Sequence, residues 1–250
     1  MHTTTTAVVL REVNYKESDK ILTLLTREMG RQTVTARGCR KKGSQSSAAC
    51  QQLVYGEFAL YEYQGRWAVK EASSLRQFRG LRDDLEKLAL ASYFAELTEQ
   101  LTQEDLPAPE VLSLLLNSLH ALDQGSWPQA QVKAAFELRI LALAGYEPLA
   151  DACAVCGRQP ERPMLHLSQG VLHCDTCRGE VGEGISMPLT PAALAALRHV
   201  LWGDPKRLFS FRLDPQSLGQ LRDLAEAYLL TQLERGFRTL DFYKQLTMKE

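Results

Sequence analysis

Cysteines are the residues of this chain whose type and spacing could do chemistry, and four of the six form two CxxC pairs. A two-residue spacer lets both sulfurs of a pair face one point, and two such pairs supply four thiolates to one zinc ion. Four protein ligands fill a tetrahedral zinc ion and leave no position for water. The spacing therefore predicts one structural Zn²⁺, held by Cys153, Cys156, Cys174 and Cys177.

Two other interpretations of these cysteines are weaker. His173 or His166 could replace one thiolate and open the site to catalysis, but no Glu stands beside a histidine as zinc hydrolases and deaminases require. Two disulfides would suit an exported protein, yet the N-terminus lacks a charged start followed by an apolar block. We therefore expect a structural zinc in a reducing compartment.

Short apolar runs at 164–167 and 171–173, joined by Ser168-Gln169-Gly170, predict a hairpin between the two cysteine pairs. Together these parts form a zinc ribbon over residues 151–184, too small to be stable without the metal or neighbouring helices. The ribbon carries more acidic than basic residues. We therefore do not expect it to bind nucleic acid by itself.

Residues 1–80 show a strand-like pattern, in which β-branched and aromatic runs alternate with turn residues. The runs are 4–13, 20–26, 32–37, 53–63 and 66–74. Five short strands without a helical segment predict a small antiparallel barrel, and the OB-fold is the five-stranded barrel of this size. Residues 38–50 form a long connection, and such a loop in a compact barrel is more often functional than incidental.

From residue 81 onward the apolar periodicity is helical. Helices are predicted over 81–101, 111–122, 129–144 and 239–246, and two more begin at the N-cap-plus-proline pairs Thr190-Pro191 and Asp214-Pro215. The ribbon is thus inserted between helices. The predicted fold class is α+β, with an OB-fold domain over 1–80 and an α-helical domain with the inserted four-cysteine zinc ribbon over 81–250.

Charge is distributed unevenly along the 250 residues, although the net charge is only −1. Residues 1–80 carry 13 Lys and Arg against 7 Asp and Glu, a net +6, so the remaining residues carry −7. No apolar run approaches the length of a membrane span. We expect a cytoplasmic protein that has no membrane partner and whose N-terminal domain attracts polyanions.

The segment 29–56 contains five basic residues and no acidic one. A barrel that binds single-stranded nucleic acid follows the phosphates with Lys and Arg while aromatic side chains stack on bases. Tyr61 and Tyr63 share a strand face opposite Leu60, which leaves both an exposed and a core placement open. The predicted DNA contacts are Arg31, Arg37, Arg40, Lys41, Lys42, Tyr61 and Tyr63.

Enzymatic activity is not expected, because no phosphate-binding loop, dinucleotide fingerprint, nucleophile elbow or HExxH motif is present. No small-molecule substrate is expected for the same reason. Cys39 lies among basic residues that would lower its pKa, but no partner base is nearby in sequence. Incidental exposure is the expected state of this thiol.

Several motifs together resemble one family. They are Tyr15-x-Glu17-x-Asp19-x-Ile21, Thr26-x-x-x-Gly30, Ala36-Arg37-Gly38-x-Arg40 with Ser44, Phe136 to Leu141, Gly145-Tyr-Glu-Pro148 and Cys153-x-x-Cys156-Gly157. In order and spacing they are similar to RecO, the bacterial recombination mediator family. The resemblance runs the length of the chain, although Cys39 stands where the family usually has a small residue and the hairpin tip lacks a Gly doublet.

The resemblance implies a non-enzymatic DNA repair factor. Such a protein binds single- and double-stranded DNA, anneals complementary strands and, with RecR, helps RecA replace single-strand-binding protein (SSB). The acidic, hydrophobic-ended SSB tail needs an apolar groove with a basic residue beside it. Lys133 and Arg139 are the candidates, although Arg139 could equally be a buried ion-pair partner.

Two other functions fit the same basic loop. An RNA-binding OB-fold protein would use it in the same way, and preference for ribose over deoxyribose would identify it. An interaction adaptor would use the loop to meet an acidic protein surface. Weak DNA binding at low ionic strength would indicate the adaptor.

Overall fold

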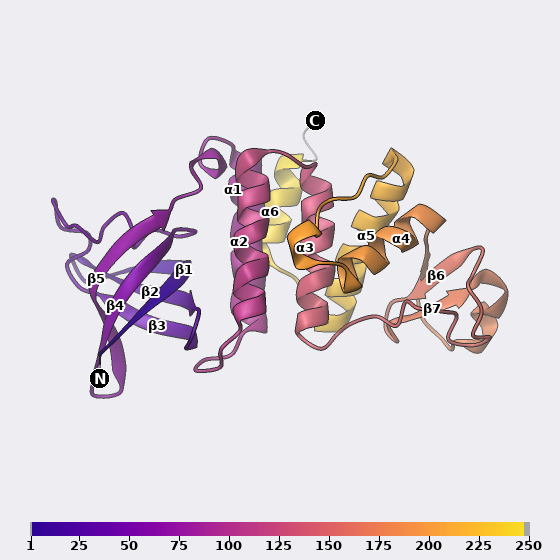
Figure 1. The fold of residues 1–250 in the computed structure, drawn as a ribbon, viewed down its shortest axis with the longest axis horizontal. Coiled ribbons are helices and arrows are strands. Elements are labelled where there is room, and N and C mark those ends of the chain that lie inside the picture. The colour runs from indigo at the N-terminus through magenta and orange to yellow at the C-terminus, as the bar shows by residue number, and fades with distance from the viewer. Residues whose placement is uncertain (1, 248–250) are drawn as a thin grey trace. The chain divides into compact units, whose positions relative to one another are not determined.

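The computed structural model describes residues 2–247, and five strands at its start close into a barrel (Figure 1). The strands are β1 (His2–Tyr15), β2 (Asp19–Thr26), β3 (Gly30–Ala36), β4 (Tyr55–Tyr63) and β5 (Arg66–Arg76). Their order is β1-β2-β3-β5-β4, and all neighbours are antiparallel except β3 and β5. The predicted five-stranded barrel is confirmed.

Alternating side chains of the strands fill the barrel. Ala7 and Val9 from β1, Leu22 and Leu24 from β2, and Phe58 from β4 meet in one buried cluster. Because side chains alternate along a strand, Val8 and Leu10 point away from this cluster, yet they are buried too. β1 is the strand on which helix α1 packs, so both of its faces are covered.

Three helices belong to the same compact unit as the barrel, which comprises residues up to Gln124 and from Phe237 onward and is here called the first unit. They are α1 (Leu85–Leu101), α2 (Pro109–Gln124) and α6 (Arg238–Thr247), preceded by a short 3₁₀ turn, η1 (Arg79–Leu81). Helix α1 packs against β1, α2 and α6. Its N-terminus is capped by Asp84, whose carboxylate accepts from two backbone N–H groups.

The second unit, Gly125–Gly236, is built on helices α3 (Gln129–Leu143), α4 (Pro191–Trp202) and α5 (Pro215–Leu233), which pack against one another, and on a small sheet. A 3₁₀ turn, η3 (Pro205–Arg207), lies between α4 and α5. The two predicted N-caps are confirmed, because the side chains of Thr190 and Asp214 accept backbone N–H groups of the first turns of α4 and α5.

The small sheet has the order β7-β6-β8 and contains the predicted hairpin. Its strands are β6 (Pro163–His166), β7 (Val171–Cys174) and β8 (Ser186–Pro188), with a 3₁₀ turn, η2 (Asp175–Glu180), after β7. The sequence pattern does not predict strand β8, which pairs with β6 and lies just beyond the predicted end of the ribbon at Gly184. Three residues are too few to show a period, and β8 is defined only by its pairing with β6.

The compact units do not follow the change from strands to helices near residue 80. Helices α1, α2 and α6 share a unit with the barrel, whereas the ribbon shares one with α3, α4 and α5. The predicted boundary near residue 80 therefore marks a change of sequence pattern, and the domains 1–80 and 81–250 stay a prediction. None of the helices in residues 2–247 is both long enough and apolar enough to cross a bilayer.

Gly30, the first residue of β3, lies at the contact between the barrel and the segment after α1. Its φ is +66°, and a Cβ there would lie 2.1 Å from the carbonyl oxygen of Leu106. Gly65 has a similar φ of +71° with nothing within 4 Å of its Cβ position.

We therefore expect Gly30→Ala to destabilise the protein more than the matched Gly65→Ala. Both substitutions cost about 1–2 kcal/mol for a left-handed backbone conformation, and only Gly30→Ala adds the steric clash. Urea unfolding of the two variants measures the difference. Equal losses of stability would show that the segment after α1 moves away without cost.

Candidate metal centre and nucleic-acid interface

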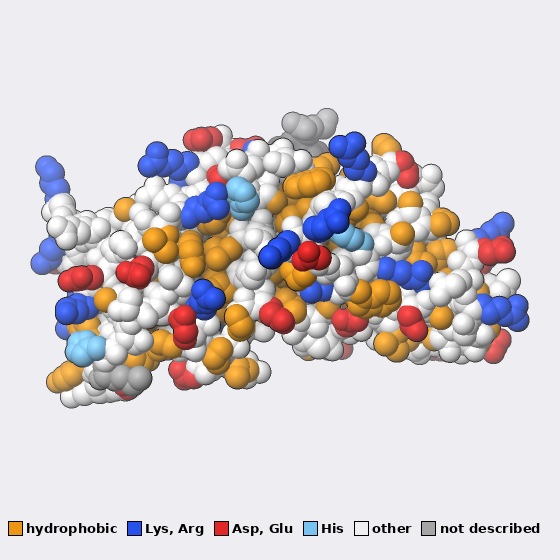
Figure 2. All heavy atoms as spheres, in the orientation of Figure 1, with side chains coloured by type: hydrophobic (Ala, Val, Ile, Leu, Met, Phe, Trp, Pro, Cys, Tyr) orange, Lys and Arg blue, Asp and Glu red, His pale blue; other side chains and the backbone are white. Residues whose placement is uncertain are grey.

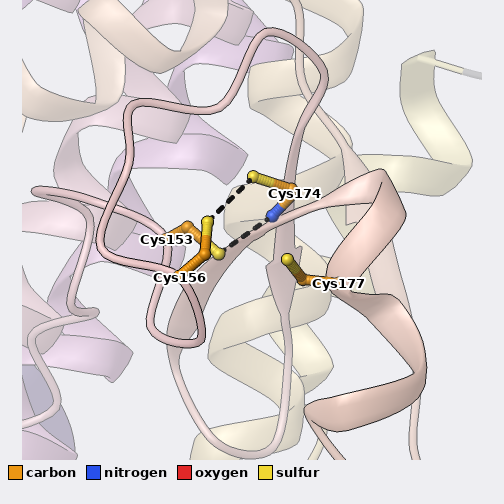
Figure 3. Close-up of side chains that lie close together, drawn as sticks. All are labelled: Cys153, Cys156, Cys174 and Cys177. Carbon is orange, nitrogen blue, oxygen red and sulfur yellow. Dashed lines mark hydrogen bonds between the residues drawn. The ribbon is translucent and has the colours of Figure 1, made fainter.

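Four cysteine side chains converge in the ribbon of the second unit (Figure 3). Cys153 and Cys156 lie in the loop after α3, where Gly157, with φ +69°, turns the chain and donates its N–H to the carbonyl of Cys153. Cys174 ends β7 and Cys177 lies in η2. The hairpin brings the second pair back to the first, because the backbone N–H of Cys174 donates to Sγ of Cys153.

The four sulfurs fit a metal ion such as zinc. All lie within 4.8 Å of one another, and the Sγ atoms of Cys156 and Cys174 are 3.8 Å apart. Sulfurs placed tetrahedrally at about 2.3 Å from a zinc ion are about 3.8 Å from each other. A disulfide requires about 2.05 Å, and all six cysteines are free thiols.

The histidines of the ribbon lie outside this cluster. In His173 both ring nitrogens have oxygen neighbours at 2.8 Å, the Cys174 carbonyl and the Ser186 hydroxyl. Nδ1 of His166 lies near Ser168 Oγ and accepts from the backbone N–H of Gln169. The alternative with a histidine in place of a thiolate is not supported by this arrangement.

Without a cation the four thiols cannot all ionise, because their charges lie too close together. Loss of solvent contact, followed by the neighbouring sulfurs of Cys153 and Cys156, raises the pKa of Cys174 to about 12. Burial also raises the pKa of Cys153, but hydrogen bonds from backbone N–H groups outweigh it and lower the pKa to about 6. Metal binding must therefore displace protons from this cluster.

We expect the apparent affinity for Zn²⁺ to rise as the pH is raised from about 6 to 8, since protons and metal compete for the sulfurs. Titration with a chromogenic chelator measures it. Cys177→Ser is expected to lose the bound zinc, whereas Thr176→Ala, an exposed residue between two ligands, should retain it. A pH-independent affinity would contradict binding through thiolates.

A groove of about 1330 Å³ runs along the barrel. It is bounded by the β1–β2 turn, strands β2 and β3, the β4–β5 hairpin and the segment after α1. Its polar and aromatic lining includes Tyr15, Lys16, Asp19, Gln32, Thr33, Thr35, Arg37, Tyr61, Glu62, Tyr63, Gln64, Arg66, Trp67, Glu104 and Asp105. The combination of tyrosines with cations suits a nucleic-acid strand, although the acidic side chains restrict where phosphates can lie.

The structure brings three of the predicted DNA contacts into this groove, namely Arg37, Tyr61 and Tyr63. Tyr63 is 62% exposed and Tyr61 is half-buried, so both rings are accessible from the groove. Trp67 lines the groove as well but also packs against the barrel core. The strand alternation thus separates Leu60, which is buried, from the two tyrosines.

The other predicted cations, Arg40, Lys41 and Lys42, are exposed on the connection between β3 and β4. Its first part is fixed to the β1–β2 turn, because the backbone N–H of Gly38 donates to Asp19 and that of Arg40 donates to the Ser18 carbonyl. Cys39 in this first part is buried, and so are Ala49, Cys50, Leu53 and Val54 further along. The connection is therefore a packed cover of the barrel with an exposed basic tip.

Cys39 corrects an expectation. It is buried in the barrel core with Cys50, so the nearby cations do not control its ionisation. Burial raises the pKa of Cys39, and it raises the pKa of Cys50 to about 12. Both thiols are therefore protonated packing residues.

Arg31 lies apart from the other predicted contacts. One of its guanidinium nitrogens donates to the carbonyl of Glu99 at the end of α1, and another lies 4.0 Å from the carboxylate of Glu104. Its side chain thus links β3 to helix α1.

Three residues that line the groove, Tyr15, Lys16 and Arg66, were not predicted as DNA contacts from the sequence. They lie beside the β1–β2 turn and in the β4–β5 hairpin. Their closeness in sequence to Asp19 and Trp67 was the available signal.

Neither predicted partner-binding residue faces solvent freely. Lys133 is 2% exposed, and its ammonium lies 2.8 Å from carboxylate oxygens of both Glu137 and Glu226. Burial lowers the pKa of Lys133, but these two carboxylates outweigh it and raise the pKa. Arg139 is half-buried and donates to the carbonyls of Val200 and Leu201 in α4.

We expect Lys133→Ala to destabilise the second unit by about 3–5 kcal/mol, because it removes the ammonium that balances the buried carboxylate of Glu137. Lys206→Ala, an exposed control in the same unit, should change stability by less than about 0.5 kcal/mol. Chemical denaturation measures both. If the Lys133→Ala protein is folded and its stability is unchanged, the ion pairs of Lys133 are not structural, and Lys133 becomes a candidate for partner binding again.

Comparison with known proteins covers nearly the whole chain. The family model "Recombination protein O N terminal" matches residues 1–78, and "Recombination protein O C terminal" matches residues 82–241. The chain is 31% identical over 244 residues to DNA repair protein RecO of Acetivibrio thermocellus, covering 97% of this chain and 96% of that protein. It is 32% identical over 243 residues to the RecO protein of Myxococcus xanthus, with 96% of each chain covered.

Proposed function

The chain belongs to the RecO family of DNA repair proteins, and from that premise we propose that it binds single- and double-stranded DNA and anneals complementary strands. With RecR, it promotes the loading of RecA onto SSB-coated DNA. The single observation that supports this function most directly is the anchored basic tip beside a groove with accessible tyrosines.

The DNA contacts that we carry forward are Arg37, Arg40, Lys41 and Lys42 for phosphates, and Tyr61 and Tyr63 for bases. Within residues 2–247, no carboxylate forms an ion pair with any of the four cations. Arg40 also donates to the carbonyl of Glu17, which orients its side chain. Uncompensated cations on a fixed backbone attract phosphates without a large ordering cost. Arg31 is a supporting contact at most, because its guanidinium is engaged by α1.

Annealing requires no catalytic residue, and we assign none. Two complementary strands repel each other through their phosphates, and a protein that neutralises both lowers this repulsion. Stacking on Tyr61 and Tyr63 contributes about 1–3 kcal/mol per base. It also keeps the stacked bases from pairing with other bases of the same strand. Such a function belongs in the cytoplasm, where bacterial DNA lies.

The zinc ion is proposed to be structural. Cys153, Cys156, Cys174 and Cys177 would supply all four ligands and leave no open position. The ribbon then supports helices α3, α4 and α5, in the unit where we propose that protein partners bind. RecR and the C-terminal tail of SSB are those partners; neither Lys133 nor Arg139 is retained as their contact.

Replacing Arg37, Arg40, Lys41 and Lys42 by Ala is expected to weaken single-strand binding and to reduce annealing strongly while the fold is retained. Four phosphate contacts predict a slope of about −3 for log affinity against log salt, and the variant should bring it toward zero. Fluorescence anisotropy across a salt series measures the slope. A wild-type protein that fails to bind DNA at low salt would overturn the proposal in favour of an adaptor, and a strong preference for RNA would favour the RNA-binding alternative.

A further inference from the structure

A second basic surface lies on the end of β5 and the connection from β5 to α1. From Ala72 to Arg82 the chain has three arginines and no acidic residue. Arg76, Arg79 and Arg82 are all exposed, and no ion pair involves any of them in the part of the chain that the structure describes. We call these three residues the arginine surface. In Figure 2, Lys and Arg side chains gather beside the β5–α1 connection as well as at the projecting loop of the barrel.

The backbone that carries the arginine surface is held firmly. Phe78 is buried with a left-handed φ of +45°, and the guanidinium carbon of Arg76 lies 5.4 Å from its ring centroid. The N–H of Gly80 donates to the carboxylate of Asp123 at 2.8 Å. Arg82 donates to the carbonyl of Gln52 at 3.0 Å. The guanidinium groups therefore project from a fixed turn, which lowers the entropy cost of binding.

The arginine surface is distant from the groove along the same sheet. In the β4–β5 ladder, Tyr63 pairs with Arg66 at the groove end, and Tyr55 pairs with Arg76 at the other. Eight residue steps at about 3.3 Å each separate these ends by about 26 Å. Several Debye lengths lie between them at physiological salt, where the Debye length is about 8 Å. The groove and the arginine surface therefore contact separate phosphates. The connection that carries the basic tip runs between them, since Ser46 Oγ accepts from the backbone N–H of Ala72.

We propose that the arginine surface binds the phosphates of a second nucleic-acid strand while the groove and the basic tip hold the first. This inference rests on the proposed annealing function and assigns each strand its own site. Arg is suited to phosphate because its planar fork donates two hydrogen bonds to adjacent oxygens. An acidic protein fits less well, since protein interfaces need an apolar centre and Leu75 is the single large exposed apolar side chain between Ala72 and Arg82.

The test uses the full chain carrying Arg76→Gln and Arg79→Gln. Arg82 is kept because it donates to Gln52. The matched control is Arg158→Gln with Arg162→Gln, which removes two exposed charges from the ribbon. Three quantities are measured for each protein: affinity for one labelled strand, the rate of annealing, and energy transfer between two non-complementary strands that carry a donor and an acceptor.

We expect the arginine-surface variant to bind one strand within about threefold of wild type, because the tip and groove are intact. Its annealing rate should fall by about tenfold or more, and energy transfer between the two strands should be lost. The control should match wild type in all three. Arg76→Lys with Arg79→Lys should recover part of the co-binding, since the charge is retained.

Two outcomes separate the proposals. If wild type neither binds nor anneals DNA, the proposed function itself fails. If wild type anneals and the arginine-surface variant anneals and co-binds strands equally well, only the second-strand site is overturned, and an acidic protein becomes its expected ligand. Unchanged thermal unfolding of the variant confirms that a loss does not come from misfolding.

Discussion

Mutual repulsion among cations is the constraint on which the proposed DNA interface depends. One loop carries the adjacent residues Arg40, Lys41 and Lys42, and on a flexible loop in water their charged side chains would repel one another and point apart. They keep a common location because the loop is anchored to the barrel, through Gly38 at its start and through buried Cys50 toward its end.

The parts that could be predicted from sequence are those determined by local chemistry. The cysteine spacing predicts the four-thiol cluster, since two short spacers and a hairpin leave few other arrangements. Thr190 and Asp214 predict helix starts, because an N-cap satisfies N–H groups two and three residues away. Alternation places Leu60 on one face and Tyr61 and Tyr63 on the other, but it leaves open which face is exposed, and only the structure shows that the tyrosines are accessible.

The parts that could not be predicted depend on neighbours distant in sequence. From its local sequence Lys133 could be a surface cation. In the fold, however, α5 places Glu226, which lies 93 residues later in the chain, beside its ammonium. Arg31 belongs to a basic run, yet the end of α1 determines where its guanidinium lies. Cys39 stands among cations in sequence but faces the core, where burial determines its pKa. In each case packing between segments distant in sequence determines the surroundings of the side chain, and no local sequence pattern indicates them.

In the proposed annealing function, the distance between the groove and the arginine surface lets the barrel hold two polyanions at once. A single cationic site that received both strands would have to neutralise twice the charge at one place, and the second strand would meet the first strand's phosphates before any cation. The groove end of β4 and the arginine surface lie about 26 Å apart along the strand, beyond the range over which phosphates repel strongly at physiological salt. The length of β4 sets the separation of the groove from the arginine surface, because Tyr63 lies at the groove end of the ladder and Tyr55 at the other end. In this proposal the barrel is a spacer as well as a binding surface.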